Sequence, residues 1–170
     1  MSTFFAQPYS NDAIGFYFDT FEQYELNVSQ CKDCFGHAVE EFELQFIDGD
    51  TEDAQAFEAC RIDQVNILFW FEEVERLTRA EKAALYFLCN VLGCTTEDSL
   101  RRLEDVQLYS GALKDASVDL FDEVYIDQIP ANLRHYIDYE AFARDCEVGG
   151  EMTEFKFAGE TFTCTNASAV

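Results

Sequence analysis

The chain has 170 residues, 48% of them hydrophobic and 15% aromatic, and its 34 Asp and Glu against 11 Lys and Arg give a net charge of −23. This aromatic content excludes a disordered acidic chain, which would be poor in apolar side chains. The charge excludes nucleic acid as a direct partner, because its phosphates would be repelled. No apolar run approaches the roughly 18 residues of a membrane span. We therefore expect a folded protein with cationic partners, bound neither to nucleic acid nor to a membrane.

The first elements along the chain alternate between strand and helix. GFYF (15–18) suits a strand, and the TFEQ motif that begins at Thr20 fits a capping box for a helix through about Cys31. In FELQFI (42–47) apolar and polar residues alternate, which is typical of a half-buried strand. DGD (48–50) then predicts a turn.

The middle of the chain is predicted to be helical. Asp63 can cap a segment that contains Val65, Leu68, Phe69 and Phe71. A second capping box, TRAE, begins at Thr78, and Gly93 is a suitable C-terminal stop for the apolar run before it. Thr95 or Thr96 opens a third short helix with Leu100 and Leu103.

The last part of the chain mixes helix and strand. Ser117 precedes a predicted helix from about Val118 to Ile129, which Pro130 ends. Its residues Val118, Phe121 and Tyr125 fall on one face. Asp138 can cap a helix that stops at Gly149-Gly150, and EFKFAGETFTC then predicts a hairpin that turns near Ala158-Gly159.

These patterns predict an α+β protein made of three small modules in an elongated chain. The modules are an α/β module over 1–60, a helical module over 61–110 and an α+β module over 111–170. They differ in charge, since 13 acidic and 1 basic side chains fall in the first, 9 and 6 in the second, and 12 and 4 in the third. An elongated arrangement reduces the self-repulsion of this charge.

Two segments have the residue types of metal sites but lack complete ligand sets. Asp48, Asp50 and Glu52 resemble the start of a calcium loop, yet the required Gly and Glu are replaced by Asp53 and Ala59. We therefore interpret this segment as a solvated acidic loop.

The second segment is Cys31-x-x-Cys34-x-x-His37, which lacks the second ligand pair of a structural zinc site. We expect no metal and no cofactor. The seven cysteines are expected to be reduced thiols in the cytoplasm, because the N-terminus shows no signal-peptide pattern. No nucleophile elbow, phosphate loop or catalytic triad is visible, so we expect no enzymatic activity.

The acidic residues themselves are the candidate functional feature. In one group Phe42, Leu44 and Phe46 anchor a display of carboxylates, and a second group lies on and beside the predicted helix that follows Ser117. The first group is Glu40, Glu41, Glu43, Asp48, Asp50, Glu52 and Asp53; the second is Asp115, Asp119, Asp122, Glu123 and Asp127. At one charge per ~1.7 Å of duplex, a net charge of −23 matches roughly 40 Å of DNA. The alternatives are an ordinary solvated helix face and a halophilic adaptation, against which the 17 Phe residues argue.

The chain resembles the ArdA family of antirestriction proteins. The most specific segments are EDVQLYSG (104–111) and IPANLRHYIDYEAFARD (129–145), and RAEKAALYFLCNVLG followed by TTEDSLRRLEDV fits in order and spacing. The N-terminal third fits more loosely, through GFYFDTFEQYE and VEEFELQFIDGD. The CKDCFGH segment (31–37) is not typical of the family.

The resemblance implies a non-enzymatic DNA mimic that occupies the DNA-binding groove of type I restriction–modification enzymes. It also implies three small domains and a homodimer. Two alternatives stay open at this point. One is an acidic inhibitor of another DNA-binding machine, such as a CRISPR effector or a nucleoid protein, and the other is an acidic chaperone of basic proteins.

Overall fold

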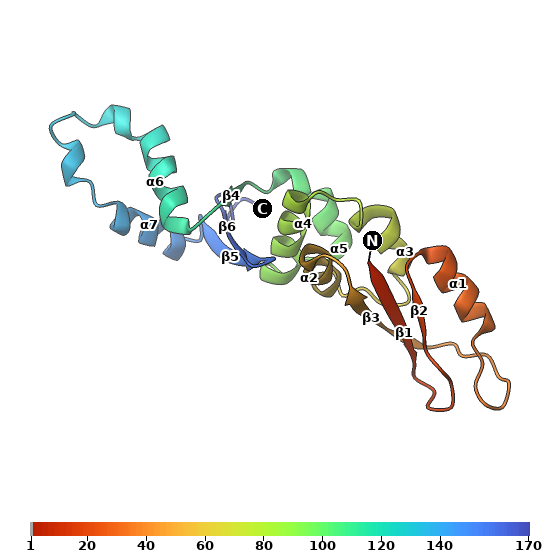
Figure 1. Cartoon of the computed structure of the whole chain (residues 1–170). Coiled ribbons are helices and arrows are strands. Elements are labelled where there is room, and N and C mark those ends of the chain that lie inside the picture. The colour runs from red at the N-terminus through yellow and green to blue at the C-terminus, as the bar shows by residue number, and fades with distance from the viewer. Residues whose placement is uncertain (1) are drawn as a thin grey trace. The chain divides into compact units, whose positions relative to one another are not determined.

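The computed structural model describes residues 2–170, which divide into two compact units, one ending at Asn90 and one beginning at Val91 (Figure 1). Each unit contains a three-stranded antiparallel sheet accompanied by helices. The predicted α+β class is confirmed. The division into three modules with boundaries near residues 60 and 110 stays a prediction.

The sheet of the N-terminal unit has the order β2-β1-β3, with β1 (Thr3–Pro8) in the centre between β2 (Phe16–Phe18) and β3 (Phe42–Asp48). Phe4 of β1 pairs with Phe18 on one side and Phe46 on the other. Phe4 and Phe18 are fully buried, so the alternation of the strands directs their aromatic rings into one core.

The helical segments of this unit are α1 (Phe21–Gln30), α2 (Thr51–Ala59), α3 (Ile67–Phe69) and α4 (Arg79–Tyr86). α3 continues as a π-helical turn over Trp70–Val74, and α4 continues as another over Phe87–Val91. Trp70 is fully buried, with its ring 6.0 Å from that of Phe4 and 5.3 Å from that of Phe57. The segment after residue 60 therefore shares one aromatic core with the sheet.

Local signals mark the starts of α1 and α4 correctly. The Thr20 hydroxyl accepts a hydrogen bond from the Gln23 backbone N–H, and Thr78 and Glu81 form the complete predicted capping box. Asp63 accepts hydrogen bonds from the backbone N–H groups of Val65 and Asn66.

Two predictions for this unit are wrong. The segment that we interpreted as an acidic loop is divided between two elements, since Asp48 ends β3 and Glu52 lies in α2, which begins at Thr51. The helix predicted to follow Asp63 does not begin there: residues 64–66 form a turn, Val65 and Leu68 are exposed, and the buried face is Ile67, Trp70 and Val74. The physical reason is that α3 begins only at Ile67, and its inward face follows the spacing of three and four residues from that point.

The C-terminal unit begins with α5 (Thr96–Arg101), capped by the Thr95 hydroxyl, and a 3₁₀ turn over Leu103–Asp105. Its sheet has the order β4-β6-β5, and two longer helices follow one another between β4 and β5. These strands and helices are β4 (Leu108–Ser110), β5 (Thr153–Phe157), β6 (Glu160–Cys164), α6 (Leu113–Val124) and α7 (Tyr139–Val148). Two 3₁₀ turns, Ile126–Gln128 and Arg134–Tyr136, lie between α6 and α7. The buried cluster between the helices contains Leu113, Ala116, Ala143, Cys146 and Met152.

The hairpin and α7 agree with the sequence prediction. Asp138 caps α7 by accepting from the Ala141 N–H at 2.9 Å, and Gly150 with a φ of 74° follows its end. The hairpin turns at Ala158 and Gly159, whose φ values of 50° and 80° suit a type I′ turn.

Helix α6 differs from its prediction at both ends. It begins at Leu113, five positions before Val118, and ends at Val124, well before Pro130. The Glu154 carboxylate of β5 accepts a hydrogen bond of 2.8 Å from the Leu113 N–H. An acceptor from a distant strand thus replaces the local side-chain cap, which the sequence around residue 112 does not reveal.

Candidate functional site

The first acidic group lies on and around β3. Glu40, Glu41, Glu43, Asp48 and Asp50 are exposed. In the strand itself, exposed Glu43 lies between buried Phe42 and Leu44, so burial of the neighbours fixes its direction. The Gln64 side chain accepts from the Phe42 N–H at 2.7 Å and donates to the Glu40 carbonyl, which ties this edge to the next segment.

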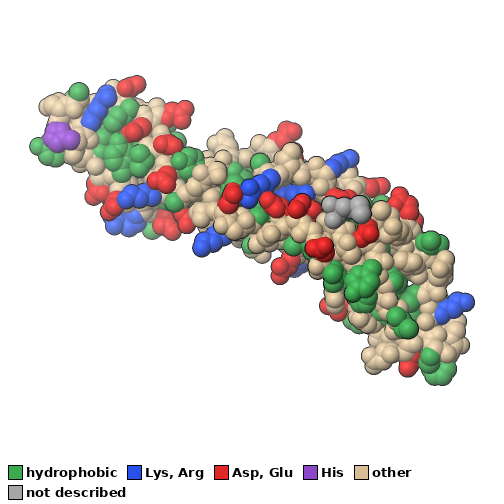
Figure 2. Space-filling view, viewed as in Figure 1, with side chains coloured by type: hydrophobic (Ala, Val, Ile, Leu, Met, Phe, Trp, Pro, Cys, Tyr) green, Lys and Arg blue, Asp and Glu red, His purple; other side chains and the backbone are tan. Residues whose placement is uncertain are grey.

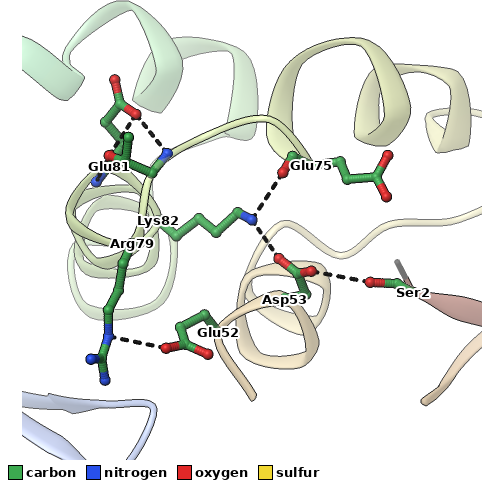
Figure 3. A network of polar contacts seen from close by, with 8 residues as sticks. Ser2, Glu52, Asp53, Glu75, Arg79, Glu81 and Lys82 are labelled. Atoms are coloured by element: carbon green, nitrogen blue, oxygen red, sulfur yellow. Dashed lines mark hydrogen bonds and ion pairs between the residues drawn. The ribbon is translucent and has the colours of Figure 1, made fainter. Parts of the chain in front are cut away.

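Asp53 does not belong to this display, and its prediction as a surface charge is wrong. It lies on the inner side of α2 and is only 7% exposed. The ammonium group of Lys82 in α4 forms an ion pair with one carboxylate oxygen, and the Ser2 hydroxyl donates to the other at 3.1 Å (Figure 3). Lys82 also donates to the Glu75 carbonyl at 3.0 Å. The Asp53 charge is therefore matched inside the unit.

Glu52 occupies an intermediate position. Its carboxylate lies 3.0 Å from the Arg79 guanidinium, and its side chain is 26% exposed (Figure 3). A charge held this way contributes less to an external field than an unpaired one. Of the predicted first group, the two acids of α2 are thus partnered, and the acids on and beside β3 are exposed.

The second acidic group follows α6. Asp115, Asp119, Asp122 and Glu123 are all exposed on this helix, and Asp115 lies within its first turn rather than before it. Asp127 lies in the following 3₁₀ turn, 3.6 Å from the Arg134 guanidinium. That carboxylate is 95% exposed, so this pair is weak.

Tyrosines from neighbouring elements lie against the α6 carboxylates. The Tyr139 hydroxyl donates to Asp122 at 2.6 Å, and this hydrogen bond raises the pKa of Tyr139. Burial, together with the charges of Asp119 and Asp115, raises the pKa of Tyr109. Two tyrosines thus interact with the carboxylates of α6.

Most of these carboxylates have no cation beside them. Within residues 2–170, no Lys, Arg or His side chain lies within 4.0 Å of nine of the predicted acids. They are Glu40, Glu41, Glu43, Asp48, Asp50, Asp115, Asp119, Asp122 and Glu123. Figure 2 shows acidic side chains spread over both units on the visible face, with hydrophobic side chains exposed among them.

Hydrogen bonds to Asp33 order the CKDCFGH loop. Asp33 accepts from the N–H groups of Phe35 and His37, and its second oxygen lies 3.1 Å from His37 Nδ1. The Cys31 thiol donates to the Ile14 carbonyl at 3.7 Å. In the described part of the chain, no three His, Cys, Asp or Glu side chains are arranged to hold a metal ion.

The structure also brings together a pair of adjoining grooves that the sequence analysis missed. They run along α1 and the segment from Gln64 to Glu75, and Phe21 and Leu68 line both of them. The sequence feature that could have indicated the grooves is the pair Val65 and Leu68. These two apolar residues lie on a segment whose buried positions are occupied by Ile67, Trp70 and Val74.

A model of the family described as "Antirestriction protein (ArdA)" matches residues 13–158. The chain belongs to the ArdA family. Membership implies antirestriction activity, and members of the ArdA family are inhibitors rather than enzymes. The matched range includes the CKDCFGH loop and α6, whereas β1 lies before it. The comparison with curated proteins finds no match. Among residues 2–170, no helix has the length and apolar character needed to cross a membrane.

Proposed function

We propose that this ArdA protein inhibits type I restriction–modification enzymes by acting as a DNA mimic in their DNA-binding groove. The observation that carries the proposal is the set of exposed carboxylates without cation partners on β3, its flanks and α6. Regular elements anchored by buried side chains hold these charges at constant positions. A flexible acidic tail could not maintain such spacing.

The spacing on α6 suits this role. Residue 119 follows residue 115 by four positions, and residues 122 and 123 follow residue 119 by three and four, which places the Cβ atoms of each such pair ~5–6 Å apart. This is comparable to the spacing of phosphates along a DNA strand. A groove that attracts DNA through Lys and Arg would attract such an array by the same long-range field.

The proposal includes the assembly and the place of action. We propose a homodimer, because a second copy would double the length of the charge array. The protein would act in the cytoplasm, where a restriction–modification enzyme meets incoming DNA. It would bind the enzyme itself, and neither nucleic acid nor a membrane would be its partner.

Competition with DNA tests the proposal directly. A labelled duplex is bound to a purified type I enzyme, and its displacement by the protein is followed by fluorescence anisotropy at several salt concentrations. We expect displacement whose affinity weakens steeply with salt, as for a ligand that makes many ionic contacts. Failure to displace the duplex at any ratio would reject the proposal.

Two other outcomes of this experiment would favour one of the alternative functions. Displacement of DNA from a CRISPR effector or a nucleoid protein, but not from the type I enzyme, would retain mimicry with another target. Binding to basic proteins in general, with no displacement of DNA, would favour an acidic chaperone.

A further inference from the structure

An apolar groove with an acidic rim follows one side of the N-terminal unit. Its larger part has a volume of about 490 Å³ and is lined by Tyr24, Val28 and Phe42, among others. Its smaller part, of about 400 Å³, extends to Phe71. Phe21 and Leu68 line both parts, so the apolar surface is continuous from one to the other.

Two aliphatic side chains of this groove are exposed to solvent, and other residues of the same segment form the face that is buried in the core. Val65 is 85% exposed and Leu68 is 40% exposed, whereas Ile67 and Trp70 beside them are buried. Adjacent apolar side chains that remain in water, in a recess rimmed by polar groups, are typical of a binding surface. The groove can therefore enclose an apolar side chain from another molecule.

The rim of the groove is acidic. Among the described residues, no Lys or Arg lines either part of the groove. Six acids line it: Asp19, Glu22, Glu25, Glu40, Glu72 and Glu75. Burial, then the neighbouring Asp53, raises the pKa of Glu75. One oxygen of Asp19 is enclosed and receives no hydrogen bond from the described residues. This surface thus has an excess of acceptors and negative charge.

We infer that this groove binds an apolar side chain carried on a Lys- or Arg-rich segment of the target enzyme. The inference rests on the proposed function and adds a non-electrostatic contact to it. The acidic rim of the groove disfavours an acidic surface of a second copy as its occupant, and it disfavours nucleic acid because of the phosphates. A buried anchor in a pocket with a polar rim around it is a common geometry at the centre of protein interfaces.

Substitutions of Val65 test the inference, with Val148 as a matched control. Val148 lies at the end of α7 and is 82% exposed, close to the 85% of Val65. Val65→Ser and Val65→Lys are compared with Val148→Ser and Val148→Lys by direct titration of the type I enzyme. Circular dichroism and thermal unfolding establish that each variant is folded.

We expect Val65→Ser to weaken binding by about fivefold with an unchanged salt dependence, because it removes apolar contact without changing charge. Val65→Lys should weaken binding by more than about tenfold, because it adds repulsion of the cationic segment. Each Val148 variant should stay within about twofold of the wild type. Glu25→Gln on the rim should weaken binding and reduce its salt dependence.

The outcomes separate the two proposals. If the wild type displaces DNA but the Val65 variants bind as it does, or Val148→Lys loses as much as Val65→Lys, the groove inference alone is rejected. If the wild type binds without displacing DNA, mimicry is rejected, and the Val65 variants still decide the groove. If the wild type does not bind the enzyme, both are rejected.

Discussion

At the scale of single residues, the fate of a carboxylate depends on what lies beside it. Asp53 and Glu43 are both acids of the same acidic stretch, yet one is buried against Lys82 and the other is exposed on β3. Taking a charge out of water is costly unless a partner compensates it. Asp53 is therefore part of the framework that joins α2 to α4, and Glu43 is available to a partner molecule.

Replacing Lys82 by Met should destabilise the N-terminal unit. The change leaves Asp53 buried without its cation, and such losses typically cost about 3–5 kcal/mol. Denaturant unfolding would measure the effect, and adding Asp53→Asn to the variant should recover part of it. As a control, Arg76→Met disrupts the exposed Arg76–Glu73 pair and should cost at most about 1 kcal/mol. Equal losses in the two single variants would contradict this account.

At the scale of elements, local hydrogen bonds cap the starts of α1, α4, α5 and α7. In the capping box of α4, the Thr78 hydroxyl and N–H both donate to Glu81, and these bonds lower the pKa of its carboxyl group. An acid whose pKa is lowered by folding stabilises the protein above its ordinary titration range. That contribution is lost as the pH falls through the lowered pKa.

Thr78→Ala should lower the free energy of unfolding by about 0.5–2 kcal/mol at neutral pH. The difference from the wild type should shrink as the pH falls below the ordinary titration range of a glutamate and through the lowered pKa of Glu81. Thermal unfolding over a pH series measures both effects. Thr95→Ala, which removes the cap of α5 at Asp98, is the control for loss of a cap at a different helix. A Thr78→Ala deficit that grows at low pH would refute the sign of this linkage.

Helix α6 is the element on which the distributed-charge hypothesis is most directly tested. A series from one to five substitutions would neutralise Asp115, Asp119, Asp122, Glu123 and Asp127 as Asn or Gln. Each exposed charge should contribute only ~0.2–1 kcal/mol, so inhibition should decline stepwise and lose salt sensitivity. The control is Glu73→Gln, which removes a charge already paired with Arg76. One substitution that abolishes inhibition would indicate a single dominant contact, and unchanged potency of the folded five-fold variant would exclude α6 from the interface.

At the scale of the whole molecule, the net charge of −23 opposes folding and favours binding to a cationic groove. Repulsion among the carboxylates opposes the folded state, and salt screens it over a Debye length of ~10 Å at 0.1 M. The same screening weakens attraction to a cationic groove.

Raising sodium chloride from about 50 to 500 mM should therefore raise the midpoint of thermal unfolding while it lowers the affinity for the type I enzyme. Differential scanning calorimetry and binding titrations on the same samples measure the two trends. An affinity that does not respond to salt would indicate a mainly apolar interface. A midpoint that falls with salt would mean that self-repulsion does not limit stability.

The sequence by itself determined the properties that arise from composition and from neighbours along the chain. The excess of acids, the α+β class, the caps at Thr20, Thr78 and Asp138 and the turn at Ala158-Gly159 all depend on residues within a few positions of one another. Hydrogen bonds within one helical turn and the two-residue period of strands can be recognised without knowing the fold.

Only the tertiary structure decided which acids face solvent, where α6 begins and where an apolar groove opens. Lys82 neutralises Asp53 across 29 positions, and Glu154 satisfies Leu113 across 41. The sequence did not predict the central strand β1. This strand is stabilised by pairing with β2 and β3, and its short sequence does not indicate those partners. These features depend on contacts between segments distant in sequence, and burial, which sets the energy of a charge, exists only after those segments pack.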